Sequence, residues 1–302
     1  MDGFLRAAEM VRITAADSRA HGDGLRRAAR RGDMERLRRG AYVGADRWAQ
    51  AAADDRHRLR VQAAVAAAST PTLVSHRSAA VLWNMPLVGV CDERVHLTCR
   101  RSSGGLSRGA VARHAVSQEL VGCVIDDVAV TSAARTVVDL ARTYGFLTGV
   151  VAGDAAVRTG ATTLDELRTE VESVGPGRGV RAARDVVAFV DGRSESPGES
   201  LSRVRMRQLG LSMPELQHVV RDERGFVGRV DFWWEEFGVI GEFDGRTKYG
   251  LDDERAAGAR LWDEKIREDR LRATGPRVVR WIWPDAWRGV PMVAALRRAG
   301  VR

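Results

Sequence analysis

Apolar and polar positions alternate most regularly in the last third of the chain. The pattern there predicts three strands near 218–221, 229–234 and 239–244, and a fourth over 277–283. A helix over 199–209 precedes them, a helix over 261–274 lies before the fourth strand, and a short helix ends the chain. Six of the eight tryptophans lie in this region, so we expect it to form its own core.

The short turn at 235–238 predicts how the second and third strands pair. A hairpin centred between 236 and 237 places Asp231 directly opposite Glu242, and Asp244 shares the face of Glu242. A slip of one residue would undo this arrangement. Like charges directly opposed destabilise a sheet, so three carboxylates on one face need a positive charge that compensates their repulsion. A divalent cation such as Mg²⁺ supplies one, because it prefers oxygen ligands.

The first 45 residues show a different pattern. A capping box at Thr14 to Asp17 predicts a short helix closed by Gly22, and a second helix covers 25–31 and ends at Gly32. The segment 34–43 then predicts a small hairpin. Helix, turn, helix and β-wing together describe a winged helix-turn-helix.

Arginines line this segment. On the second helix, four of them form one stripe, and Leu25, Ala28 and Ala29 fall on the other side. The DNA-binding candidates are these four and three more in the hairpin: Arg26, Arg27, Arg30, Arg31, Arg36, Arg38 and Arg39. The striped helix would enter a groove of double-stranded DNA while the wing contacts phosphates. The alternative is a solvated helix face.

Between these regions, residues 46–191 predict a mixed α/β domain. Its expected elements are strands over 95–98 and 128–130, a helix that begins at Ser75 or Ser78, a helix capped by Thr131 or Ser132, and a helix over 181–190.

Two groups of polar residues in this middle domain are predicted to be structural. Arg135 and Asp139 are spaced i,i+4 on one helix and are expected to form a surface ion pair. His76, His96 and His114 lack the sequence spacing of metal ligands.

Gly/Pro/Ser-rich breaks at 175–180 and 191–198 place a domain boundary near 192. The domains are therefore expected at 1–45, 46–191 and 192–302. Ser196 and Pro197 then start a new helix as its N-cap and first residue. Glu199, the third helical residue, either completes the cap or points its carboxylate towards a site that the helix terminus faces.

Composition narrows the class of protein. The chain of 302 residues is 44% apolar and has a net charge of +8, which favours nucleic acid as a partner. The segment 25–39 alone holds seven arginines against Asp33 and Glu35. No apolar run is long enough to span a membrane, and the N-terminus resembles no signal peptide, so a cytoplasmic protein is expected. Cys91, Cys99 and Cys123 are predicted to be buried small hydrophobes.

The N-terminal and middle regions, roughly 10–185, resemble AbiEi-type antitoxins of type IV toxin–antitoxin pairs. The likeness lies in the basic segment and in the stretches TLVSHRSAAVLWNMPL (72–87), RVHLTCR (94–100) and VAVTSAARTVVDLAR (128–142). It implies DNA binding, autoregulation of a toxin operon, and a nucleotidyltransferase-like toxin as partner.

Residues 195–285 resemble the PD-(D/E)xK nuclease core, and more narrowly its very-short-patch-repair (Vsr) endonuclease-like branch. The family pattern is a Glu on a helix, an Asp on the second strand and an E-x-D-G-x-x-H/K run on the third. The matching residues are Glu199, Asp231, Glu242, Asp244, Gly245 and Lys248, followed by EKIREDRLRATGPRVVRWIW (264–283).

The resemblance assigns roles to these residues. Asp231 and Glu242 would hold Mg²⁺ or Mn²⁺, with Asp244 or Glu199 as an outer ligand, for phosphodiester hydrolysis. Lys248 or Lys265, the two lysines of the chain, would stabilise the developing charge or position water. The family's usual lysine stands two residues after the Glu, where this chain has Asp244, so the fold could also have lost the chemistry and kept DNA binding.

Three functions follow as hypotheses. The first is an antitoxin-like DNA-binding regulator with a nuclease-like C-terminal domain. The second is a Mg²⁺-dependent endonuclease for defence or repair. The third is a module that only binds a toxin. The expected fold is mixed α/β: an N-terminal winged helix, an α/β middle domain and a restriction-endonuclease-like α/β/α core.

Overall fold

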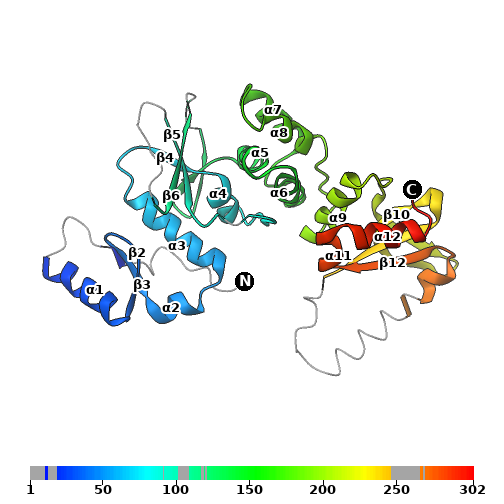
Figure 1. Cartoon of the computed structure of the whole chain (residues 1–302), viewed down its shortest axis with the longest axis horizontal. Helices are drawn as coiled ribbons and strands as arrows, with labels where there is room; N and C mark the ends of the chain where they lie inside the picture. Colours follow the sequence, from blue (N-terminus) through cyan, green and yellow to red (C-terminus); the bar gives the residue numbers. More distant parts are fainter. Residues whose placement is uncertain are drawn as a thin grey trace. The chain divides into compact units, whose positions relative to one another are not determined.

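The structure is a computed structural model of the chain (Figure 1). It describes residues 11–12, 19–90, 92–100, 109–116, 119, 121–245, 266–267 and 269–302. The fold is mixed α/β, and the chain divides into two compact units. The first contains the described residues up to Ala152 together with 161–187, and the second contains 153–160 and 188–302. No helix in the described segments is both long and apolar enough to cross a membrane.

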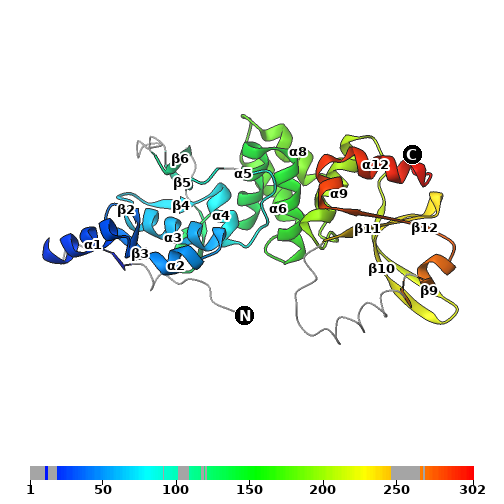
Figure 2. The ribbon, with the colours of Figure 1, turned by 60° about the horizontal axis from the view of Figure 1, so that its bottom comes forward.

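The first unit begins with a small sheet beside a helix. The strands are β1 (Val11–Arg12), β2 (Met34–Arg38) and β3 (Ala41–Gly44), in the order β1-β3-β2, and α1 (Arg19–Arg31) precedes the β2–β3 hairpin (Figure 2). The hairpin expected at 34–43 is therefore confirmed.

The predicted break between two helices at Gly22 is wrong. The helix α1 runs without interruption from Arg19 through Gly22 and Gly24. A helix tolerates an isolated glycine at a cost of about 1 kcal/mol, so glycine alone is a weak stop signal. Residues 13–18, which hold the predicted capping box, lie outside the described residues.

The rest of the first unit is a five-stranded sheet with helices. The strands are β4 (Thr72–Val74), β5 (Val95–Arg100), β6 (Val111–Val116), β7 (Cys123–Ile125) and β8 (Val128–Val130), in the order β6-β5-β4-β8-β7. The helices are α2 (Ala45–Gln50), α3 (Ala53–Ala66), α4 (His76–Leu82), α5 (Ala133–Tyr144), α6 (Phe146–Arg158), α7 (Leu164–Ser173) and α8 (Val180–Val187), of which α6 contributes to both units. The pair β5–β6 is parallel, and so is β4–β8.

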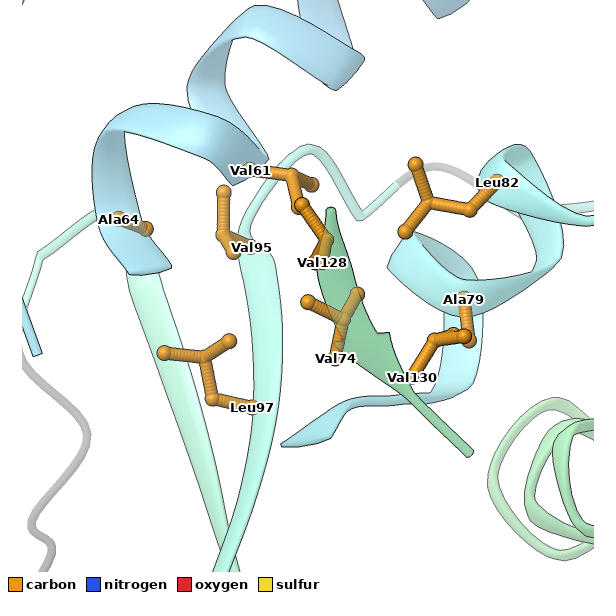
Figure 3. Close-up of a cluster of buried hydrophobic side chains, with 9 residues drawn as sticks. All are labelled: Val61, Ala64, Val74, Ala79, Leu82, Val95, Leu97, Val128 and Val130. Carbon is orange, nitrogen blue, oxygen red and sulfur yellow. The ribbon is translucent and has the colours of Figure 1, made fainter. Parts of the chain in front are cut away.

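The core of this unit lies between the sheet and the helices α3 and α4 (Figure 3). Apolar side chains from β4, β5 and β8 point into the same space as side chains from both helices: Val61, Ala64, Val74, Ala79, Leu82, Val95, Leu97, Val128 and Val130. Val95 and Leu97 alternate along β5 with His96 and Thr98, so the two polar residues lie on the opposite face of the sheet.

The two helix starts expected in this region are found. The helix α4 follows Ser75, and α5 follows Ser132, whose Oγ accepts a hydrogen bond of 3.1 Å from the backbone N–H of Arg135. Ser132 is therefore the N-cap of α5, whereas the hydroxyl of Thr131 lies 2.8 Å from that of Thr136.

Two predictions of burial in this unit are wrong. Arg135 and Asp139 form their ion pair at 3.0 Å, but Asp139 is only 3% exposed, because α5 packs against α4, α7 and α8. Cys123 was expected to be buried and is exposed, because β7 is an edge strand of the sheet. Cys99 is buried as expected, and Cys91 lies outside the described residues.

The second unit contains a four-stranded sheet and helices. The strands are β9 (Glu215–Asp222), β10 (Gly225–Trp234), β11 (Val239–Asp244) and β12 (Arg277–Ile282), in the order β12-β11-β10-β9. The helices are α9 (Pro197–Gln208), α11 (Trp283–Arg288) and α12 (Val290–Arg298), and the described residues between 266 and 273 are also helical. β9, β10 and β11 pair antiparallel, and β12 is parallel to β11.

Helices contact both faces of this sheet. Trp281 stacks on Phe232 and donates a hydrogen bond of 2.8 Å to Ser202 of α9. The helix α9 packs beside α11 (Figure 1). Leu271 packs against Ile240. A Cβ at the next residue, Gly241, would meet Trp281, so Ile240 lies on the other face of the sheet.

The β10–β11 pairing agrees with the register expected from the turn. The paired residues are Phe232 with Gly241, Trp233 with Ile240, and Trp234 with Val239. The turn is the 3₁₀ helix η3 (Glu235–Phe237), which Gly238 closes in the left-handed region at φ 56°. The positions of Asp231 and Glu242 follow directly from this register.

Candidate functional site

Asp231 and Glu242 lie where β10 and β11 part. The last residues that pair between the two strands are Phe232 and Gly241, which are the sequence neighbours of Asp231 and Glu242. In place of a further ladder bond, the Asp231 Oδ2 accepts a hydrogen bond of 2.8 Å from the backbone N–H of Phe243. The carboxylate of Asp231 is therefore held between the strands, and Glu242 is the neighbouring residue on β11.

Glu199 reaches the same place from the N-terminus of α9. Ser196 and Pro197 occupy the expected cap and first helical positions, and the Ser196 Oγ accepts the backbone N–H of Glu199 at 3.2 Å. The Glu199 carboxylate is only 6% exposed, and its Oε2 accepts the backbone N–H of Glu195 at 2.8 Å. Glu199 thus both stabilises the helix start and lies near Asp231 and Glu242. We call these three residues the carboxylate cluster.

Gln217 links the carboxylates of Glu199 and Asp231. The sequence analysis did not identify it. It lies on β9 across from Asp231, between the pairs that Val230 and Phe232 make with His218 and Leu216. Its Nε2 donates a hydrogen bond of 2.9 Å to Glu199 Oε2, and it also hydrogen-bonds Asp231. Its backbone has φ 57°, which is rare for a residue other than glycine. The first strand was predicted to start at 218, so its alternation gave no signal for residue 217.

The surroundings of Asp231 oppose its ionisation. Burial, then the charge of Glu199 and to a smaller extent that of Glu242, raise the pKa of Asp231 to about 7, although hydrogen bonds from Phe243 and Gln217 act in the opposite direction. Strongly shifted titratable groups are concentrated at functional sites. A bound cation would remove this repulsion, because opposite charge favours the ionised form.

Glu242 is held by two arginines in this arrangement. It is 9% exposed, its Oε1 accepts a hydrogen bond of 2.9 Å from Arg267, and its Oε2 accepts one of 2.8 Å from Arg280. Arg280 is the β12 partner of Glu242 in the parallel register. These arginines were also missed, because they lie on a helix and a strand that are distant in the sequence, and such contacts cannot be read from local alternation. A metal ion at Glu242 would have to displace at least one of them.

Three further residues were predicted to belong to this site. Asp244 is exposed at the end of β11. Lys248 and Lys265 lie outside the described residues. The carboxylates do not converge closely enough to form a metal site as they stand. Among the described residues, the side chains that do converge in this way are His76, His96 and His114.

The predicted DNA-binding arginines form an exposed basic surface with one exception. Arg26, Arg27, Arg30 and Arg31 are exposed along one side of α1, while Leu25, Ala28 and Ala29 are partly buried. Arg36 and Arg39 are exposed at the hairpin. We call these six arginines the basic surface.

The exception is Arg38. Its side chain is partly buried and donates a hydrogen bond of 3.3 Å to the backbone carbonyl of Ala64 in α3. We therefore leave Arg38 out of the basic surface; a bulge between Arg36 and Arg38 changes the alternation along β2.

Two neighbouring acids lie close to the basic surface. Asp23 pairs with Arg26 at 2.6 Å, and Asp33 pairs with Arg31 at 2.8 Å. All four side chains are more than half exposed, so each pair is weak and exchanges readily for another anion.

Comparison with known proteins gives relatives without a described function. Two Mycobacterium tuberculosis proteins, named Uncharacterized protein MT2308 (strain CDC 1551 / Oshkosh) and Uncharacterized protein Rv2248 (strain H37Rv), are each 31% identical over 165 residues. The match covers 55% of this chain and spans 59% of the length of each relative. No family model matches the chain, and no solved structure matches it.

Proposed function

We propose that this chain is a DNA-binding protein that carries a nuclease-like C-terminal unit. The observation that supports this most is the basic surface. Six exposed arginines are gathered on one helix side and the adjoining hairpin, within a chain of net charge +8. Arginines in such a cluster neutralise phosphates and release counterions from DNA.

The resemblance to AbiEi-type antitoxins supports a regulatory form of this function. It covers the basic surface and the five-stranded sheet, and it implies operator binding by the chain and a nucleotidyltransferase-like toxin as a partner. We expect such a regulator to act in the cytoplasm. The resemblance to the PD-(D/E)xK core supports DNA as the ligand of the second unit too.

A DNA-binding assay with two charge-matched variants tests the basic surface. We expect replacement of Arg26, Arg27, Arg30 and Arg31 by alanine to weaken binding of a duplex, measured by fluorescence anisotropy, at least about 10-fold at moderate salt. The control replaces four exposed arginines elsewhere with alanine: Arg168, Arg181, Arg184 and Arg298. Equal affinities for the two variants would exclude the basic surface as the DNA-binding site.

The second candidate function is a metal-dependent endonuclease, and the raised pKa of Asp231 favours it. Glu199, Asp231 and Glu242 come from α9, β10 and β11 and lie together at the point where the strands part. Oxygen ligands of this kind suit Mg²⁺ or Mn²⁺, which would supply an activated water and offset charge on the phosphate. Asp231 and Glu242 would hold the ion, and Glu199 and Gln217 would position Asp231.

Cleavage assays separate this candidate from DNA binding alone. Plasmid, single-stranded and mismatched DNA would be incubated with Mg²⁺ or Mn²⁺ and with the wild type, Asp231→Ala, Glu242→Ala, or the control Glu215→Ala at an exposed position of β9. An active site predicts cutting that only the first two substitutions abolish. Cutting that survives in both would show that another nuclease is responsible.

A further inference from the structure

Three histidines that are far apart in the sequence meet in the first unit. His76 is the first residue of α4, His96 lies on β5 and His114 lies on β6. β5 and β6 are parallel, and Thr98 pairs with His114. His96 therefore shares a sheet face with His114, on the side away from the apolar core.

The rings are close enough to share one ion. The centroids of His76 and His114 are 3.6 Å apart, and that of His96 lies 5.2 Å from His114 and 5.6 Å from His76. One ring nitrogen from each residue lies within 4.8 Å of the other two. Small side-chain movements bring three nitrogens at such distances to a common metal, because Zn–N bonds are about 2.0–2.1 Å.

The hydrogen bonds of His96 leave a lone pair that faces another histidine. Its Nε2 lies 3.2 Å from the Asp92 Oδ2, and this carboxylate oxygen accepts a hydrogen bond from the ring N–H. A hydrogen on Nε2 leaves Nδ1 as a lone pair, and this Nδ1 lies 2.9 Å from His114 Nε2. A carboxylate behind a histidine is the usual arrangement around a ligating imidazole.

A carboxylate oxygen without a partner lies beside the same rings. Asp139 is 3% exposed and its Oδ1 accepts a hydrogen bond of 3.0 Å from Arg135, but its Oδ2 is buried and has no hydrogen-bond partner. This oxygen lies 3.8 Å from His76 Nδ1. A buried polar atom without a partner costs free energy, and a bound cation would satisfy it.

Charged side chains of both signs surround the rings. Two carboxylates lie beside the rings, Asp92 beside His96 and Asp139 beside His76. Arg135 is nearby, but it is paired with Asp139 and with Glu170.

A cavity gives an ion access to the site. It has a volume of about 520 Å³ and is lined by His76, His114 and Asp139 together with Thr98, whose hydroxyl is also buried without a partner. Four arginines also line the cavity: Arg113, Arg135, Arg142 and Arg178.

We propose that His76, His96 and His114 bind Zn²⁺, with the Oδ2 of Asp139 as the fourth ligand. Three imidazoles and one carboxylate are a tetrahedral donor set that suits zinc and other late transition metals rather than Mg²⁺. The ion joins α4, α5, β5 and β6. His76 has a backbone φ of 51°, and the metal would help to stabilise this conformation. The site is independent of the carboxylates in the second unit.

Metal analysis of the untagged full chain tests the proposal. We expect about one zinc per chain after desalting, and a visible absorption spectrum of tetrahedral Co²⁺ when cobalt is added to the metal-free protein. His114→Ala, at a partly exposed position, should lower zinc affinity at least about 10- to 100-fold. The control His218→Ala, which removes a histidine stacked on Trp233 in the second unit, should bind zinc as the wild type does.

A second variant guards against loss of folding. His114→Cys retains a zinc ligand and should give a new sulfur-to-Co²⁺ charge-transfer band in the near ultraviolet. No zinc bound by the folded wild type, equal affinity in His114→Ala, or no such band in His114→Cys would each overturn the proposal.

Discussion

At the scale of single residues, Asp231 shows how sequence position and environment combine. Two other acids and burial oppose its charge, and the strand register that placed it near Glu242 could be predicted from the turn and the alternation. Its partner Gln217 and the arginines on Glu242 could not, because they belong to strands and a helix distant in the sequence.

The pKa of Asp231 predicts a pH dependence of stability in the metal-free protein. The folded-state pKa of about 7 exceeds the ordinary value of 3.8, so between these values the folded state keeps a proton that the unfolded state has lost. The free energy of unfolding therefore falls as pH rises through this window and levels off above it. Asn cannot ionise, so Asp231→Asn should be more stable than the wild type at about pH 8, by on the order of a few kcal/mol, and similar at about pH 4.

Urea unfolding followed by tryptophan fluorescence measures this difference. The control is Asp222→Asn, because hydrogen bonds from Arg270 lower the pKa of Asp222 and give the opposite sign. The control should gain no stability at high pH. A wild type and an Asp231→Asn variant with the same pH dependence would contradict the account of the cluster.

At the scale of elements, the sequence was sufficient to predict the features that depend on one continuous segment of the chain. The cap at Ser196, the strand over 239–244 and the hairpin register all follow from adjacent residues. The histidine cluster depends instead on the parallel pairing of β5 with β6, which the spacing of residues 76, 96 and 114 does not reveal. The expectation that these histidines are structural was based on sequence spacing alone.

The packing of α9 on β11 gives a prediction at this scale. A Cβ at Gly198 would collide with the ring of Phe243. Gly198→Ala should therefore destabilise the second unit by about 1–3 kcal/mol, because the helix must shift off the strand. It should also disturb Glu199, the next residue, and so lower any activity of the carboxylate site.

The matched control is Gly228→Ala in the same unit. Its nearest neighbours are atoms of the flexible Arg267 side chain, which can move, so a cost below about 1 kcal/mol is expected. Urea unfolding by tryptophan fluorescence compares the two. A Gly198→Ala variant as stable as Gly228→Ala would mean that α9 and β11 are not in close contact.

At the scale of the whole molecule, the two units have different candidate chemistry. The first contains the basic surface and the histidine cluster, and the second contains the carboxylate cluster on a mixed four-stranded sheet. The basic surface was predictable because seven arginines within 25–39 hold most of the charge excess, and one of them, Arg38, donates a hydrogen bond to Ala64. The basic surface is the observation on which our proposal of DNA binding depends.

The salt dependence of DNA affinity tests that claim most directly. Each phosphate contact contributes about −0.9 to the slope of log affinity against log salt concentration. Loss of Arg26, Arg27, Arg30 and Arg31 should therefore make the slope shallower by up to about 3 to 4, while the control variant keeps the wild-type slope. An unchanged slope in the four-arginine variant, with the wild type bound to duplex DNA, would contradict the claim that this surface binds DNA.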